Sequence, residues 1–353
     1  MPTLLGGLSA KAQITADTTT NTRVDIGNLT LPPGSPAVGA YIIIGGTAKG
    51  TNLFHSFSSF SPHNIPTEFN LSDPNITNIF SRVTTTDAAN LSTLDGYLQI
   101  IGGNSPNLFL INPNGISVGP NANLNISGFL FLSTADRVLF NESGSDFFSA
   151  SDTAHSLLTV SVPVGLQFGA DANPISWDGT GRSSRYAFND GTTVSLLSGG
   201  VNVQNAYFRI VSGRIQLGSL DAGAEVALNA DTHELAYGER LPLQDISLSN
   251  VALDVDGRGD VDVDGNGEVD GGGNLQIKGR DVNADEAYLF SNTSGSENGG
   301  LIDLRAHSLS LTLNNSQIIS AVFDRSGNLT ATGRGSDINI AAKTFVSQGT
   351  TVV

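Results

Sequence analysis

The sequence predicts an all-β protein, and three observations support this class. Gly accounts for 41 of the 353 residues, and Asn, Ser and Thr are abundant, which is typical of a chain with many tight turns. Short apolar runs rich in strand-forming residues alternate with Gly, Asn and Pro turns, and few stretches look helical. In the last quarter of the chain a short strand pattern recurs, which favours a solenoid of stacked β-coils.

The first twelve residues resemble the end of an export signal. Ala10-Lys11-Ala12 fits the small-x-small pattern of a signal-peptidase site, which makes Gln13 the first mature residue. The apolar region before this site is short and has no basic head. We therefore interpret residues 1–12 as the remnant of a signal peptide whose beginning is missing, with an ordinary flexible terminus as the alternative.

Two strands are predicted within the next fifty residues. Residues 41–44 are aliphatic or aromatic and are followed by two glycines that end the strand. Residues 53–60 mix apolar with small polar side chains. His55 in this second strand could serve as a base, but no Ser/Asp partner pattern accompanies it, so we expect a packed histidine whose ring nitrogens are satisfied.

Two turns of similar chemistry follow. Asp73-Pro74-Asn75-Ile76 places Pro where a turn needs φ near −65°, and Asp73 can accept local hydrogen bonds while Ile76 anchors the turn. The second turn, Asn112-Pro113-Asn114-Gly115, separates an apolar strand at 108–111 from a strand that starts at Ile116. Asn114 or Gly115 can supply the positive φ that such turns often need. Neither turn contains an evident nucleophile or general base, so the turns are expected to serve folding.

A match to a catalytic motif lies beside the second turn. Residues 115–119 fit Gly-x-Ser-x-Gly, which in serine hydrolases needs a strand before it and a helix after it. The strand is predicted, but residues 120–125 have no helical pattern and no partner His stands out. Serine-hydrolase chemistry is therefore disfavoured.

The middle of the chain contains one polar interruption. Residues 171–192 are polar and rich in Gly and Ser, which predicts a surface excursion between segments 163–169 and 212–220. The single Trp, Trp177, lies in this stretch, and its role cannot be predicted.

Polar residues, all of them acidic except Arg258 and Asn266, alternate strictly with apolar residues and glycines between 253 and 270. A period of two places the acids on one face of an extended chain, which favours a solvated β-arm or hairpin. The alternative is a structural calcium site, because Asp260, Asp262 and Asp264 match the first half of an EF-hand loop. The position of the bidentate Glu is Gly271, however, and flanking helices are not predicted. No cofactor is therefore expected.

The repeat begins after this acidic stretch. Residues 273–277 align with residues 300–304 and 336–340, so that Leu275, Ile302 and Ile338 take equivalent places. The chain ends on an apolar strand without a polar cap, and we therefore expect residues 246–353 to be the first coils of a region truncated at its C-terminus.

The composition excludes several partners. The formal net charge is −16, and only four of the 17 basic residues are Lys, which argues against binding to nucleic acid or anionic membrane. No apolar run is long enough to span a bilayer, so membrane insertion is not expected. The absence of Cys suits a chain that threads a narrow pore unfolded.

Several ordered motifs resemble the two-partner secretion (TPS) domain of filamentous-haemagglutinin-like exoproteins, also known as the haemagglutination activity domain. Residues 103–116, which end in Asn-Pro-Asn-Gly-Ile, are similar to the family signature. Residues 52–57, 163–169 and 212–220 resemble further segments of that domain. Residues 73–76 stand where the family carries Asn-Pro-Asn-Leu, with Asp in place of the first Asn and Ile in place of Leu.

The resemblance covers residues 13–245 and implies a right-handed parallel β-helix with an extra-helical capping sheet near the N-terminus. It implies a secreted or cell-surface protein of a Gram-negative-type bacterium, exported through the periplasm and recognised there by a dedicated outer-membrane β-barrel transporter. The chain would cross the barrel unfolded, fold at the surface as a monomer, and belong to an adhesin for an unidentified host-cell or surface ligand, or to a toxin carrier.

Two other functions stay open at this point. One is a β-helical polysaccharide lyase or hydrolase, which would need a groove with carboxylates and a basic residue. The acids at 254–270 lie in a regular alternation that favours a solvated face, so no enzyme activity is expected. The other is a matrix or surface-layer protein that uses no transporter.

Overall fold

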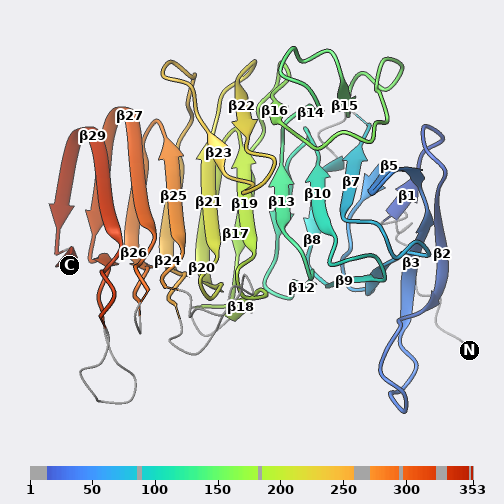
Figure 1. Ribbon diagram of the computed structural model, residues 1–353, viewed down its shortest axis with the longest axis horizontal. Helices are drawn as coiled ribbons and strands as arrows, with labels where there is room; N and C mark the ends of the chain where they lie inside the picture. Colours follow the sequence, from blue (N-terminus) through green and yellow to red (C-terminus); the bar gives the residue numbers. More distant parts are fainter. Residues whose placement is uncertain are drawn as a thin grey trace, which may run out of the picture.

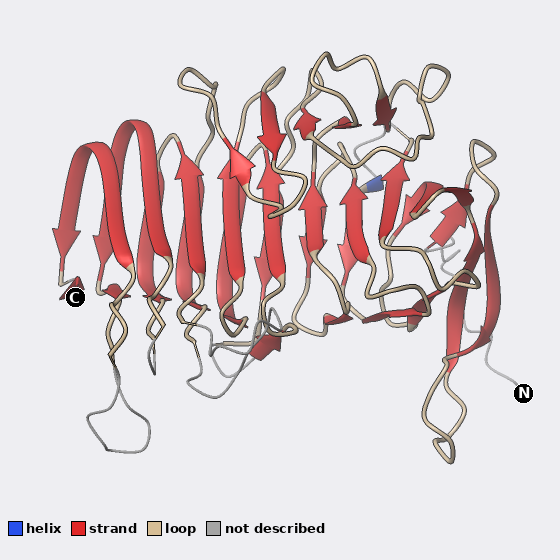
Figure 2. Cartoon of the chain, in the orientation of Figure 1, coloured by secondary structure: helices blue, strands red, loops and turns tan. Residues whose placement is uncertain are grey.

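The protein is a right-handed parallel β-helix, seen in a computed structural model that describes residues 14–85, 90–181, 185–257, 271–293, 297–322, 332–349 and 351–352. The coils stack along the long axis from the N-terminal end to the C-terminal end (Figure 1). Strands and their connecting turns make up nearly all of the described chain (Figure 2). The predicted all-β class and the β-solenoid architecture are confirmed.

The first face of the helix is one continuous parallel ladder. In order along the axis its strands are β5 (Asn52–Phe60), β7 (Asn78–Val83), β10 (Asn107–Ile111), β13 (Leu130–Ser133), β19 (Thr193–Ser198), β21 (Arg214–Ser219), β25 (Asn274–Gly279), β27 (Leu301–Asn314) and β29 (Asp337–Gln348). Leu275 pairs with Ile302, and Ile302 pairs with Ile338, so the repeat predicted from the sequence lies in the predicted register.

The second face is a parallel ladder of β8 (Ser92–Leu94), β11 (Ile116–Val118), β17 (Ile175–Asp178), β20 (Val201–Arg209), β24 (Ile246–Asp254) and β26 (Val282–Phe290), continued by the later parts of β27 and β29. The second halves of β20, β24 and β26 turn onto a third face, together with β18 (Arg185–Ala187), β28 (Gln317–Ile319) and β30 (Thr351–Val352). This corner is formed by residues of left-handed conformation, with φ from 45° to 54°: Asn205, Asn250, Glu286 and Asn315.

The N-terminal coils close differently. Their third face is a separate sheet of β12 (Asn123–Asn125), β9 (Tyr97–Ile101), β6 (Thr67–Asn70), β3 (Gly39–Gly45) and β2 (Thr22–Asn28), in which β2 and β3 form an antiparallel hairpin. The strands β1 (Ile14–Ala16) and β4 (Thr47–Lys49) pair antiparallel with β5. They cover the edge of the first coil, which would otherwise present unpaired backbone groups.

A further antiparallel sheet lies outside the helix, over the first face (Figure 1). It consists of β15 (Phe147–Ser149), β14 (Arg137–Leu139), β16 (Gly165–Gln167), β22 (Glu225–Leu228) and β23 (Leu235–Ala236). The chain leaves the helix for this extra-helical sheet after β13 and again after β21. Both excursions start at the corner between the first and second faces.

Two apolar cores follow from this arrangement. Alternate residues of each first-face strand point inward and stack from coil to coil, as Leu108, Leu130 and Val194 do. Other residues point outward, and four of them form a column of stacked rings with centroids 5.2, 4.8 and 4.5 Å apart: Phe54, Phe80, Phe109 and Phe131. These rings are buried only because the extra-helical sheet covers them, so the sheet and this outward Phe column belong together.

One sequence-based prediction is wrong, and another is confirmed in part. Residues 171–192 are not a surface excursion, because β17 and β18 lie in them and Trp177 is fully buried among Tyr186 and Phe208. His55 is a packed histidine with no solvent exposure, and its Nδ1 lies 3.1 Å from Thr22 Oγ1. Its Nε2 is buried without a hydrogen-bond partner among the described residues, so the expectation of a fully satisfied ring is wrong.

Several predictions are not tested by the described residues. The predicted signal remnant at 1–12 and the calcium candidates Asp260, Asp262 and Asp264 lie outside them. The predicted division of the chain at residue 245 also stays a prediction. The second-face ladder runs from β20 through β24 to β26 on both sides of that position.

Candidate functional site

The turn at residues 112–116 forms the corner between the first and second faces. Asn112 follows directly on β10 and is fully buried. Its Oδ1 accepts hydrogen bonds from the backbone N of Asn114 at 3.0 Å and from the Asn114 side chain at 2.9 Å, and Gly115 N donates to the Asn112 carbonyl at 3.0 Å. The predicted turn is therefore present, closed by the Asn side chain in the manner of an Asx turn.

The same turn is tied to the preceding coil. Asn112 Nδ2 donates to the Asn90 carbonyl and to Ser92 Oγ, both at 2.9 Å, and Asn114 Nδ2 donates to the Thr85 carbonyl. The Asn112 side chain thus makes four hydrogen bonds, two as donor and two as acceptor. A buried amide satisfied in this way fixes the relative position of two coils.

The turn is also tied to the following coil and to the extra-helical excursion. Asn112 N donates to the Ser133 carbonyl at 2.9 Å, where the chain leaves the helix. Asn173 Nδ2 donates to the Pro113 carbonyl at 2.8 Å, and Ile116 N donates to the Pro174 carbonyl at 3.3 Å, where the chain returns. The turn therefore contacts three successive coils and both ends of the first excursion.

Gly115 and Ile116 complete the corner. Gly115 has φ of 110°, and a Cβ there would lie 2.9 Å from Leu91 Cδ1 and 3.3 Å from the Pro174 carbonyl oxygen. Only glycine suits both the conformation and the space. Ile116 is fully buried and stacks in the second-face ladder between Ser92 and Ile175.

The turn at residues 73–76 repeats this chemistry at a different corner. Asp73 Oδ1 accepts hydrogen bonds from Asn75 N and Asn75 Nδ2, both at 2.9 Å, and Ile76 is buried as the anchor. Pro74 and Asn75 are exposed, in contrast to the second turn. Because this turn precedes β7 and the other follows the parallel β10, the two lie at opposite ends of the first-face strands, roughly 17–20 Å apart. They do not form one site.

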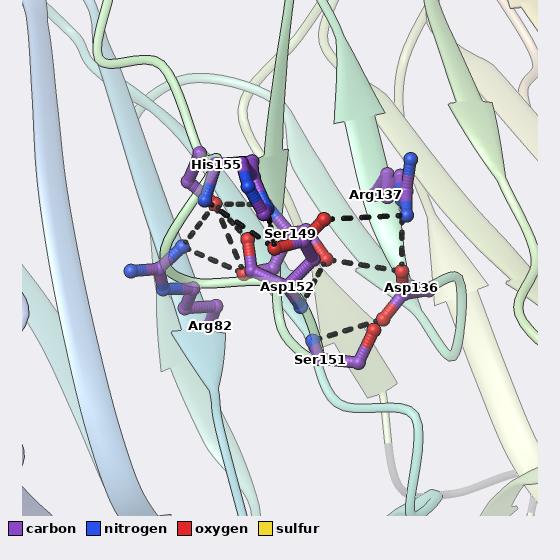
Figure 3. Close-up of polar contacts among 8 residues, drawn as sticks. Arg82, Asp136, Arg137, Ser149, Ser151, Asp152 and His155 are labelled. Carbon is purple, nitrogen blue, oxygen red and sulfur yellow. Dashed lines mark hydrogen bonds and ion pairs between the residues drawn. The ribbon is translucent and has the colours of Figure 1, made fainter.

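The buried Arg82, which the sequence did not indicate, links three parts of the fold. Figure 3 shows its contact with Ser149. From β7 Arg82 donates to the Ser149 carbonyl of the extra-helical sheet at 2.6 Å, to Ser56 Oγ at 2.9 Å and to Thr19 Oγ1 at 2.9 Å. Its guanidinium carbon lies 4.2 Å from the centre of the Phe148 ring. Arg82 thus holds the N-terminal cover and the extra-helical sheet to the first face.

Two carboxylates balance this buried charge. Burial lowers the pKa of Arg82 to about 10, although the negative charges of Asp17 and Asp136 act to raise it. Burial also raises the pKa of Asp17, but hydrogen bonds from Ser56, Thr19 and Thr84 outweigh it and hold that pKa below its usual value. Asp136 accepts from Ser149 Oγ and from Ser151 N, both at 3.0 Å (Figure 3).

Two groups that could take part in catalysis, Ser117 and His155, do not stand in a catalytic triad among the described residues. Ser117 of the Gly-x-Ser-x-Gly match lies in β11, and its hydroxyl contacts Ser176 Oγ at 3.3 Å. The exposed His155 lies 2.8 Å from Asp152, but no serine hydroxyl in the described ranges bonds to its ring (Figure 3). Across those ranges no three His, Asp or Glu side chains are placed to hold a metal ion, and no helix is long and apolar enough to cross a membrane.

Comparisons with known proteins identify the family and the fold. The family model of the TPS secretion domain matches residues 12–277. The chain is similar to the HMW1 secretion domain from Haemophilus influenzae, with a TM-score of 0.50, 15% identity, and coverage of 96% of this chain and 83% of that chain. It also matches the filamentous hemagglutinin secretion domain, with a TM-score of 0.36, 15% identity, and coverage of 95% and 99%. A search of curated proteins finds no match.

The family match spans most of the chain, and the HMW1 domain shares its fold. Proteins of this family carry secretion domains of exported exoproteins and are not classed as enzymes. On these grounds the chain belongs to the TPS secretion-domain family.

Proposed function

We propose that this chain is recognised in the periplasm by the periplasmic part of a dedicated outer-membrane β-barrel transporter. The chain then crosses the barrel unfolded, folds at the cell surface, and nucleates the β-helix of the exoprotein, an adhesin that acts on a host-cell or surface ligand. Membership of the TPS family supports the transporter as the partner.

The observation that carries the proposal is the corner at Asn112, where one turn joins three coils. Its side-chain hydrogen bonds are made within the fold, which favours a role in folding over one in contacting a partner. A coil of a solenoid gains its stability from its neighbours, so a corner that fixes three of them is suited to start the stack. The turn at Asp73 has the same side-chain closure but serves its own coil alone, which it anchors through the buried Ile76.

Recognition can be tested with the purified periplasmic domains of the cognate transporter, immobilised on a sensor surface. The chain is applied either folded or freshly diluted from denaturant. The proposal expects strong capture of the freshly diluted chain, which declines as the chain folds. Equal capture of the folded chain, or no capture in either state, would contradict passage of an unfolded chain recognised by this partner.

The role of the turn is tested in the same assay with Asn112→Ala. The variant should be captured normally at first but lose capture more slowly, because folding is delayed. Asn123→Ala, at an exposed position in β12, is the matched control and should behave as the unaltered chain. If Asn112→Ala folds at the same rate as the unaltered chain, the turn does not limit the rate of folding.

A further inference from the structure

The corner turn places Asn114 directly before Gly115, and this dipeptide is chemically reactive. The backbone nitrogen that follows an Asn can attack the side-chain carbonyl carbon of that Asn, and glycine hinders this approach least because it carries no side chain. The sequence has two other Asn-Gly pairs, which begin at Asn266 and Asn298. Asn266 lies outside the described residues, whereas Asn298 is exposed in the loop before β27. The chain therefore offers one pair in the corner and one at the surface for comparison.

The folded corner holds both reacting groups of the first pair. Gly115 is buried, and its N donates to the Asn112 carbonyl at 3.0 Å, so the nitrogen that would attack is already engaged. The nitrogen that would leave, Asn114 Nδ2, donates to Asn112 Oδ1 at 2.9 Å and to the Thr85 carbonyl. Leu91 packs against Gly115 and closes the space beside it. A ring cannot form here unless these contacts open first.

The surface pair is held in a different way. Gly299 N donates to the Arg334 carbonyl at 2.7 Å, so its backbone nitrogen is engaged as in the corner. The exposed Asn298 contacts Arg334 N at 3.0 Å through its Oδ1, which accepts the hydrogen bond. In the corner, by contrast, it is the leaving amide nitrogen of Asn114 that is held, by two acceptors. The fold therefore restrains the first pair more completely than the second.

We propose that Asn114 is a site of spontaneous deamidation that is open in the unfolded chain and closed by folding. Gly115 N attacks Asn114 Cγ, the new C–N bond closes a succinimide ring, and the Cγ–Nδ2 bond breaks. Ammonia leaves with the proton that Gly115 N gives up. Water then opens the ring at the side-chain carbonyl, which yields aspartate, or at the backbone carbonyl, which yields isoaspartate. Water is the only co-reactant.

Either product disrupts the corner. An ionised aspartate only accepts hydrogen bonds, so position 114 would present an oxygen to the Thr85 carbonyl and to Asn112 Oδ1, where the fold needs a donor. Isoaspartate also adds one carbon to the main chain before Gly115, which displaces Ile116 from its place in the second-face ladder. A chain that is modified while unfolded therefore cannot rebuild the link between the coils. This inference concerns the turn itself and does not depend on the transporter.

The first test compares the rates of deamidation at Asn114 and Asn298. The chain is kept at mildly alkaline pH in buffer and in guanidinium chloride, and timed digests are analysed by mass spectrometry, with isoaspartate detected by enzymatic methylation. The two sites should react at comparable rates in denaturant. In buffer Asn114 should react at least about tenfold more slowly than in denaturant, because the corner must first open locally, and Asn298 should be slowed less. Equal rates at Asn114 in the two samples, or equal slowing at both sites, would overturn the proposal.

The second test asks whether the modified chain folds. The double variant Asn266→Gln/Asn298→Gln keeps Asn114 as its single Asn-Gly pair. It is aged in guanidinium chloride and then returned to buffer, and the fluorescence of the buried Trp177 reports refolding. The refolded share should fall in step with modification of Asn114. Complete refolding of chains modified at Asn114 would contradict the proposed effect on the corner.

The aspartate product can also be made directly as Asn114→Asp. This variant should unfold at a lower urea concentration than the unaltered chain, because the donor to Thr85 is lost. Asn298→Asp makes the same chemical change at an exposed position and is the matched control, which should leave the midpoint unchanged. Equal midpoints for the two variants would overturn the claim that the product weakens the corner.

Discussion

Replacing Asn112 by Ala should destabilise the protein far more than a surface substitution does. The change removes four hydrogen bonds from a position without solvent exposure: two donated to Asn90 and Ser92, and two accepted from Asn114. At about 1 kcal/mol of net stability per bond, the loss is about 4 kcal/mol, and the fully buried Ser92 hydroxyl is left without this partner. Folded domains have roughly 5–15 kcal/mol in total, so this loss is a large share.

Urea denaturation measures the loss directly. Trp177 is the single Trp and is fully buried beside Phe208, so its fluorescence reports unfolding of the coil that follows the turn. The control is Asp73→Ala, which removes the same kind of turn closure at a half-exposed position. That control should cost about 1 kcal/mol, because solvent replaces the lost bonds.

The comparison between the two variants shows whether the hydrogen bonds of Asn112 to the preceding coil stabilise the protein. If Asn112→Ala costs no more free energy of unfolding than Asp73→Ala, the hydrogen bonds between coils do not stabilise the corner, and the reasoning fails. A change in the m-value alone would point to an altered denatured state instead.

Three further predictions concern other parts of the fold. Gly115→Ala should cost about 1–3 kcal/mol of stability, measured by the same urea titration, because Ala is strained at φ of 110° and its Cβ approaches Leu91; an unchanged midpoint would contradict this. Glu286→Asn should add about 0.5–1 kcal/mol, because Asn tolerates φ of 52° better than Glu and would extend the contact that Asn250 makes with Asn205 at 2.9 Å; a lower melting temperature would refute it. Burial lowers the pKa of His55 to about 3. The unfolded chain therefore takes up a proton below pH 6.5 while folded His55 stays neutral, so stability should fall as pH falls from 6.5 toward 3, by roughly 1 kcal/mol per unit. His233, with a pKa of about 4, adds to this fall, and His55→Gln should reduce the slope measured between pH 6.5 and 4.5.

Local patterns allowed the strands and the turns to be predicted, because they depend on neighbouring residues. The strand at 107–111, the turn that follows it, and the register of Leu275 with Ile302 all follow from apolar runs, turn residues and a repeat. The buried strand at 175–178 was missed although Ile175 and Trp177 alternate with polar residues. A local excess of Gly and Ser outweighed a signal that was only four residues long.

The burial of one strand by a sheet from a distant part of the chain could not be predicted in the same way. Phe80 and Arg82 both point outward from β7, and nothing in their own segment shows that a sheet from residues 137–236 will bury them. The contacts of Asn112 with Asn90 and Asn173 likewise span separate coils. The turn could be predicted from its sequence, but its place as a link between three coils depends on the stacking of the whole helix.

The most direct test of the proposed role is secretion of the chain, placed behind an intact signal peptide, in paired strains with and without the cognate outer-membrane barrel. We expect the chain in the medium or on the cell surface only when the barrel is present, and much less of it for Asn112→Ala than for Asn123→Ala. Equal release in the two strains, or retention in the periplasm in both, would contradict the assignment of this domain to transporter-dependent export.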